Sequence, residues 1–329
     1  MGKGFFPNPE LILKSKNYLE GILQGFNQPA TEVKFNSCSA KDACDGIFGL
    51  LSSRKFTYLS RVKSKPYEAA IRARVCDCFE NKKKLCLYLV LGGGYHARTS
   101  KSVKSKICFD VGLGELLALY QVKKFLKLAK SAYPFGISFF IIIDNRCAEF
   151  ANGIPVELTR GYAKRFSELI NALGLGEKVE VVLQSDIIKK SEFASMIPSL
   201  RPGGNIELTE QSCNNAVRFS YAGKISPEIS TAKYKTVNQA SRAVISEYAK
   251  GGIHLMQRAT ASTLAFRSFP GGDSKIQCGE VALLFSNGIV KKPLLLTTQN
   301  IGLYNVEKVK LGKKIGPIKS YLVAVSQDI

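Results

Sequence analysis

The sequence predicts an α/β protein built on a Rossmann-like, mostly parallel sheet. Three short apolar runs, at residues 85–91, 137–143 and 179–183, have the length of strands buried on both faces. Two segments with helical periodicity, at 115–130 and 158–173, separate them. Strands that alternate with helices in this way form parallel sheets with right-handed crossovers.

The elements before this core are expected to be helical. Apolar residues recur at helical spacing between 11 and 23, and Pro66 can begin a helix that continues to residue 79. The first strand then stops at three consecutive glycines, Gly92-Gly93-Gly94. After the second helix of the core, Gly174 supplies the stop before the third strand.

The last part of the chain has a looser pattern. It contains a possible helix at 237–248 and short apolar runs interrupted by Gly, Pro and Asn. We expect mixed or antiparallel strands that complete the sheet or form a small subdomain. The expected division is a helical segment at 1–65, an α/β core at 66–200 and a mixed C-terminal part at 201–329.

The chain is strongly basic, with 47 Lys and Arg against 26 Asp and Glu and a formal net charge of +21. Such an excess favours polyanions or phosphorylated metabolites as partners. It is partly concentrated between residues 81 and 130, where eleven basic residues face two acidic ones. A lysine-rich solvated surface explains the charge equally well. No aromatic platform for RNA accompanies it, so nucleic acid is a possible but less favoured partner.

Cysteine usage indicates a reducing compartment. Nine cysteines, an odd number, do not fit a disulfide framework. The one tight pair, Cys76-x-Cys78, lacks zinc spacing, and the chain has only two histidines, His96 and His254. We therefore expect buried free thiols, no metal site and no cofactor. Without a signal peptide or a run long enough to cross a bilayer, we expect a cytoplasmic protein that does not bind membranes.

In open α/β sheets, ligands bind outside the carboxyl ends of the strands. After the first strand, Gly93 and Gly94 would allow a close approach of the backbone to a ligand. Arg98 and Ser100 could hold a phosphate or carboxylate, and His96 could act as an acid or base near neutral pH. The pattern is neither the dinucleotide-binding glycine motif nor a P-loop, and a plain glycine turn is the alternative.

Acidic residues stand at corresponding places. Asp144 ends the second strand and precedes Arg146, so it could orient an amine or hydroxyl, or simply cap a turn. Asp186 follows the third strand in the same way. Asp110 and Glu115 flank a helix start, where the helix dipole favours acids regardless of function.

A polar loop near the C-terminus supplies two further candidates for substrate binding. Arg267 and Lys275 enclose Pro and Gly residues and could close over an anionic substrate, or belong to an ordinary surface hairpin. We interpret His254 as structural, and neither a G-x-S-x-G elbow nor an H-E-x-x-H motif occurs.

The order of these features forms a larger pattern. It comprises the strand at 85–91, Tyr95-His96-Ala97-Arg98-Thr99-Ser100, Phe109-Asp110, Gly114-Glu115, Tyr133-Pro134-Phe135-Gly136 and Asp144-Asn145-Arg146. This order resembles the isonitrile (isocyanide) synthase family of the pyoverdine and dityrosine biosynthesis type. The resemblance covers about residues 46–190 and weakens toward residue 300.

This resemblance implies a Rossmann-like transferase of secondary metabolism. Such an enzyme converts the amine of an aromatic amino acid to an isonitrile, with a pentose phosphate as carbon donor. Arg98 and Ser100 stand where the family has Lys-Ser. Asp110 and Glu115 match its acidic pair, and Asp144 matches the aspartate of its S-D-G segment.

The sequence also departs from the family. Arg98 replaces a lysine, which changes any role that needs a neutral amine. The family's late I-H-P and P-W-H segments appear at 269–271 and 297–300 without histidine. The resulting hypothesis is an enzyme for an amino acid and a sugar phosphate. Arg98 and nearby lysines would bind the phosphate, and His96, Glu115 and Asp144 would orient groups or move protons.

Two other functions stay open. A methyltransferase that uses S-adenosylmethionine also has a glycine loop after its first strand, but its acidic residue follows about twenty positions later. Asp144 lies fifty positions after Gly94. A nucleic-acid-binding or scaffold protein could instead use the basic segment at 82–106.

Overall fold

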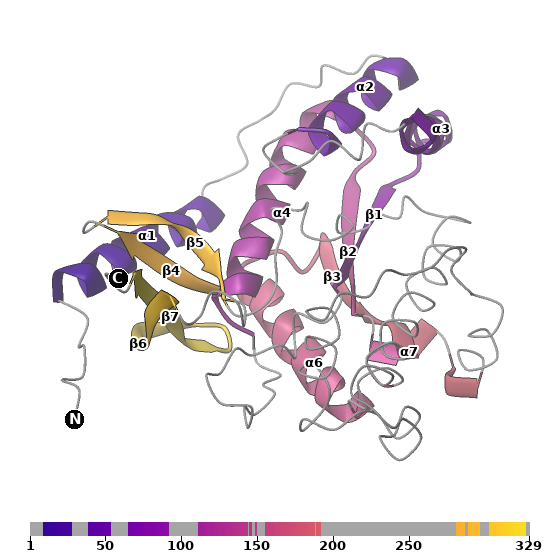
Figure 1. Ribbon diagram of the computed structural model, residues 1–329. Coiled ribbons are helices and arrows are strands. Elements are labelled where there is room, and N and C mark those ends of the chain that lie inside the picture. The colour runs from indigo at the N-terminus through magenta and orange to yellow at the C-terminus, as the bar shows by residue number, and fades with distance from the viewer. Residues whose placement is uncertain are drawn as a thin grey trace, which may run out of the picture.

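The fold is known from a computed structural model. It describes residues 9–27, 39–53, 65–91, 111–143, 145–146, 149, 155–187, 189–191, 281–286, 289–296 and 303–326. These residues form two sheets with helices packed around them (Figure 1). The helix expected at 237–248 lies outside the described residues.

The first sheet is the predicted parallel core. It consists of β1 (Leu85–Leu91), β2 (Ile137–Ile143) and β3 (Val179–Leu183), paired in this order and all parallel. Nearly every side chain of β2 is buried. This is expected of a central parallel strand, which has a neighbour on each side and is covered on both faces. The α/β class and the three strands predicted from the apolar runs are therefore confirmed.

Two helices connect these strands. α4 (Leu113–Ala132) joins β1 to β2, and α6 (Val156–Ala172) joins β2 to β3, each beginning two residues before its predicted start. Because the strands follow one another in sequence order, right-handed crossovers place both helices on the same face. The two helices are in contact there, as Figure 1 shows. Their apolar stripes, including Leu119 and Phe166, are fully buried.

α2 (Ala40–Leu51) and α3 (Lys65–Glu80) form a helix pair beside this core. α2 also packs against α4. Its Gly46 lies so near the end of α4 that an added Cβ would be 2.7 Å from the Cβ of Ala132. Any larger residue at position 46 would force the two helices apart.

The C-terminal strands form a second sheet. It contains β4 (Val281–Ser286), β5 (Ile289–Leu295), β6 (Tyr304–Ile315) and β7 (Ile318–Ser326) in the order β5-β4-β7-β6. β4 pairs with β7 in parallel, and the other two pairs are antiparallel. The mixed strands expected in this part of the sequence are thus present.

The first helix, α1 (Pro9–Asn27), packs on this second sheet and on α4. Ser15 is fully buried in that contact, and its hydroxyl donates to the Ile12 carbonyl at 2.7 Å. The Tyr321 hydroxyl of β7 lies 2.6 Å from the same Ser15 oxygen and is therefore the donor to it. This hydrogen bond thus joins the first helix to the last strand.

None of the helices in the described ranges is long and apolar enough to span a bilayer. The longest, α4, carries lysines along its exposed side.

Replacing Tyr321 tests the contact between α1 and β7. Tyr321→Phe removes the donor to buried Ser15, so we expect the free energy of unfolding to fall by about 1 kcal/mol at pH 7. Tyr304→Phe, at a partly exposed tyrosine of the same sheet, is the control and should change it by less than about 0.5 kcal/mol. Urea unfolding followed by circular dichroism measures both.

The same pair of proteins has an expected pH dependence. Burial raises the pKa of Tyr321, so the phenol ionises in the unfolded chain before it ionises in the folded one. This group's contribution to stability is complete below pH about 10 and is lost as the pH rises further. The stability gap between wild type and Tyr321→Phe should therefore narrow above pH 10. A gap that widens there would contradict the assignment.

Candidate functional site

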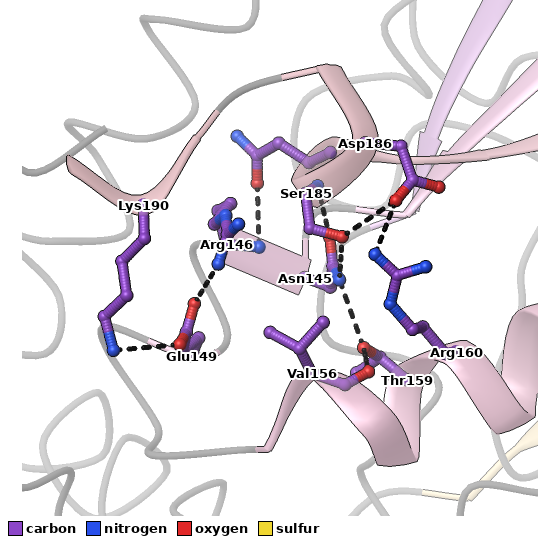
Figure 2. A network of polar contacts seen from close by, with 10 residues as sticks. Asn145, Arg146, Glu149, Val156, Thr159, Arg160, Ser185, Asp186 and Lys190 are labelled. Atoms are coloured by element: carbon purple, nitrogen blue, oxygen red, sulfur yellow. Dashed lines mark hydrogen bonds and ion pairs between the residues drawn. The ribbon is translucent and has the colours of Figure 1, made fainter. Parts of the chain in front are cut away.

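Polar side chains meet at the carboxyl ends of β2 and β3. They come from the residues after β2, from the short helix α7 (Gln184–Ile187) after β3 and from the first turn of α6 (Figure 2). This is the edge of the sheet at which open α/β folds bind their ligands.

Asn145 is the centre of this network and is fully buried. Its Nδ2 donates to Ser185 Oγ at 2.9 Å and to Thr159 Oγ1 at 3.2 Å, and its Oδ1 accepts the Ser185 N–H at 2.9 Å. The Thr159 hydroxyl in turn donates to the Val156 carbonyl at 2.7 Å. One amide therefore fixes the ends of two strands and the start of α6 relative to one another (Figure 2).

Arg146 belongs to an adjoining group of charges. Its backbone N–H donates to Gln184 Oε1 at 3.2 Å, and its guanidinium forms an ion pair with Glu149 at 2.6 Å. Lys190 approaches the other oxygen of Glu149 at 3.0 Å. Both Arg146 and Glu149 are largely buried, with 14% and 16% of their side chains exposed. Glu149 thus already compensates the positive charge of Arg146. An anionic substrate at Arg146 would bind beside that carboxylate.

Asp186, the acid after β3, lies on the surface. It forms an ion pair with Arg160 at 2.7 Å, and about half of each side chain is exposed. Solvent screens such a pair, so it contributes little to stability. The structure therefore places Asp186 at the site's rim, next to α6.

Glu115 occupies a second buried position near this edge. It lies in the first turn of α4 and is 2% exposed. Oε2 accepts the Gly112 N–H at 2.7 Å, and Oε1 accepts the Tyr162 hydroxyl of α6 at 3.0 Å. The helix dipole also favours a negative charge here. Glu115 therefore caps the start of α4, the structural role that the sequence left open. It also links α4 to α6.

Several residues of this edge were not singled out from the sequence. Asn145 and Ser185 follow directly after buried strands, a signal that could have identified them. Tyr162 lies in the helical segment predicted at 158–173, and buried tyrosine hydroxyls usually bind a polar partner. Thr159 gave no sequence signal.

The remaining predicted site residues lie outside the described residues, and their roles stay predictions. They are Gly93, Gly94, His96, Arg98, Ser100, Asp110, Asp144, Arg267 and Lys275. The described members are Glu115 and Arg146, whose hydrogen bonds belong to two different groups of residues. Both lie near the carboxyl edge of the first sheet.

Within the part of the chain that the structure describes, no three His, Cys, Asp or Glu side chains cluster in a way that could hold a metal ion. The Asn145 network consists of amide and hydroxyl groups. These groups bond to one another and to the backbone, so the network positions the ends of the strands.

Comparison with solved structures finds a likeness of fold. No protein-family model matches this sequence, and no curated protein matches it. The crystal structure of the PvcA protein from Pseudomonas aeruginosa aligns with 84% of this chain and 99% of its own, at 11% identity and a TM-score of 0.53. This likeness establishes a remote relationship of fold.

Two tyrosyl-tRNA synthetases also align. Those of Aeropyrum pernix and Archaeoglobus fulgidus are 10% and 12% identical and cover 68% of this chain. The alignments span 60% and 64% of their own chains, with TM-scores of 0.33 and 0.34. Scores of this size carry no structural argument.

The Asn145 network can be tested by its stability contribution. Asn145→Ala leaves the Ser185 N–H and the Thr159 hydroxyl in a buried place without their amide partner. The free energy of unfolding should therefore fall by about 2 kcal/mol. Asn171→Ala, on the exposed side of α6, is the matched control and should have an effect below about 0.5 kcal/mol. Equal effects of the two substitutions, measured by urea unfolding, would show that the network does not organise this edge.

Proposed function

We propose that this chain is an isonitrile-synthase-like enzyme that acts on an amino acid with a pentose phosphate as carbon donor. The observation that carries the proposal is the likeness of fold to PvcA, a protein of the pyoverdine and isonitrile synthase type, over nearly the whole of that chain. The order of sequence motifs supports the same family independently of the fold.

In this enzyme the phosphate would bind to the basic segment after β1. Arg98 would bind it, because a planar guanidinium can donate two parallel hydrogen bonds to phosphate oxygens. Lysines between residues 101 and 106 would add positive charge. His96, in the same segment, would supply the proton transfers that the conversion of an amine requires.

The amino acid would bind at the end of β2. Asp144 would orient its amine through a carboxylate oxygen, and Asp144 is the direct chain neighbour of Asn145. The three hydrogen bonds of Asn145 anchor the chain immediately after that aspartate. A site of this kind needs fixed geometry, because small displacements of a reacting group reduce the rate strongly.

Glu115 would have an orienting role in this scheme. Both carboxylate oxygens already accept hydrogen bonds, from Gly112 and from Tyr162. Such a group stabilises positive charge nearby but is poorly placed to exchange a proton. His96, rather than Glu115, would therefore transfer the protons.

Ligand-dependent stability tests this proposal. A pentose phosphate at a hundred times its Kd should stabilise the protein by about 2.7 kcal/mol. Arg98→Ala should lose that stabilisation, whereas Arg160→Ala, at an exposed arginine paired with Asp186, should keep it. Thermal unfolding with aromatic amino acids, pentose phosphates, nucleotides and S-adenosylmethionine provides the measurement. Stabilisation by S-adenosylmethionine alone would indicate a methyltransferase and contradict the proposal.

Nucleic-acid binding is a second candidate, favoured by the hairpin of β6 and β7. This hairpin carries five exposed lysines, Lys308, Lys310, Lys313, Lys314 and Lys319. None of them forms an ion pair with any described residue, and Glu307 is the one acidic residue of the two strands. β6 is an edge strand of the second sheet, and exposed lysines on it and on β7 could contact the phosphates of a duplex.

The salt dependence of duplex binding tests this second candidate. If the hairpin contacts phosphates, replacing Lys313 and Lys314 by Glu should reduce the slope of log K against log salt by about 2. Lys189→Glu, at an exposed lysine of another element, is the control and should leave the slope unchanged. No binding of wild type to a random duplex at low salt would reject this function.

A further inference from the structure

Two cysteines lie against each other where α2 packs on α3. The Cys44 thiol of α2 donates a hydrogen bond to the Arg72 carbonyl of α3 at 3.2 Å. Cys76 of α3 lies with its thiol 3.9 Å from the Ala40 carbonyl of α2. Each acceptor is the residue four positions before the other cysteine.

This reciprocity brings the two cysteines together. In an α-helix, the carbonyl of residue i−4 accepts the N–H of residue i. The Arg72 carbonyl therefore lies at the backbone of Cys76, and the Ala40 carbonyl lies at the backbone of Cys44. Each thiol thus lies beside the other cysteine's own main chain, which makes the two cysteines neighbours across the helix pair.

The two thiols differ in access to solvent. Cys44 is 2% exposed, and burial raises its pKa to about 12, with the adjacent Cys76 thiol as a further cause. Cys76 is partly exposed. An oxidant from solution therefore reaches Cys76 first, and Cys44 is its buried neighbour.

We propose that Cys44 and Cys76 form a reversible disulfide when the protein meets a peroxide. The Cys76 thiolate attacks one peroxide oxygen, the O–O bond breaks, and Cys76 becomes a sulfenic acid while hydroxide leaves. The Cys44 sulfur then attacks the Cys76 sulfur. The S–O bond breaks, and the Cys44 proton leaves with the departing oxygen as water.

The sum balances. Two thiols are oxidised by two electrons, and one hydrogen peroxide is reduced to two waters. A small thiol of the glutathione class reverses the step by attacking the disulfide. The resting protein in a reducing compartment has free thiols, as the four described cysteines do.

The bond would act on the packing beside the first sheet. It closes the chain between residues 44 and 76 and ties α2 to α3, while α2 is held against α4 at Gly46. Because a cross-link reduces the conformational freedom of the unfolded chain, the oxidised protein should unfold at a higher temperature than the reduced protein.

Peptide mapping by mass spectrometry tests the proposal on the full chain. After limited treatment with hydrogen peroxide and alkylation of free thiols, we expect a cross-linked peptide that joins Cys44 to Cys76 and is lighter by two hydrogens. The midpoint of thermal unfolding should rise by several degrees and return after reduction with dithiothreitol.

Three variants make the test specific. Cys76→Ser and Cys76→Ala should both abolish the cross-link and the thermal shift while keeping the wild-type circular dichroism. Cys86→Ser is the matched control, since Cys86 is also partly exposed, and it should retain both. Recovery of Cys44 and Cys76 as separate alkylated or overoxidised residues would overturn the proposal. A disulfide from either residue to a different cysteine would overturn it equally.

Discussion

The hydrogen bonds of the buried Glu115 carboxylate hold together the two helices that cover the first sheet. One oxygen receives the Gly112 N–H that begins α4, and the other receives the Tyr162 hydroxyl of α6. A buried carboxylate without partners would be very unfavourable. If the helices separated near the carboxyl edge of the strands, the Glu115 carboxylate would become exposed or would lose a hydrogen-bond partner. This constraint gives the edge a defined shape.

A second polar centre lies at the first turn of α6. Asn145 holds the ends of β2 and β3 against the first turn of that helix. Glu115 and Asn145 are both buried, so hydrogen bonds among protein groups, rather than solvent, determine their positions. Candidate substrate-binding residues after β1 and β2 are attached in sequence to this frame. A fixed frame of this kind is what precise positioning of two small substrates requires.

Local patterns predict the fold well, and they predict its polar contacts poorly. Apolar runs and helical stripes locate β1, β2, β3, α4 and α6 because each element's period depends only on its own residues. The links between elements depend on distant pairs. Tyr162 meets Glu115 across 47 positions, and Ser15 meets Tyr321 across 306. The sequence spacing likewise draws attention to Cys76 and Cys78, whereas the structure sets Cys76 against Cys44.

Likeness of fold does not assign a reaction, because one fold can host several reactions. The most direct measurement is therefore of product. The protein would be incubated with an aromatic amino acid and a pentose phosphate that is uniformly labelled with carbon-13, and the products would be analysed by mass spectrometry and carbon NMR. The account predicts an isonitrile whose terminal carbon carries the label. Recovery of unchanged amino acid, from folded protein that binds both substrates, would contradict it.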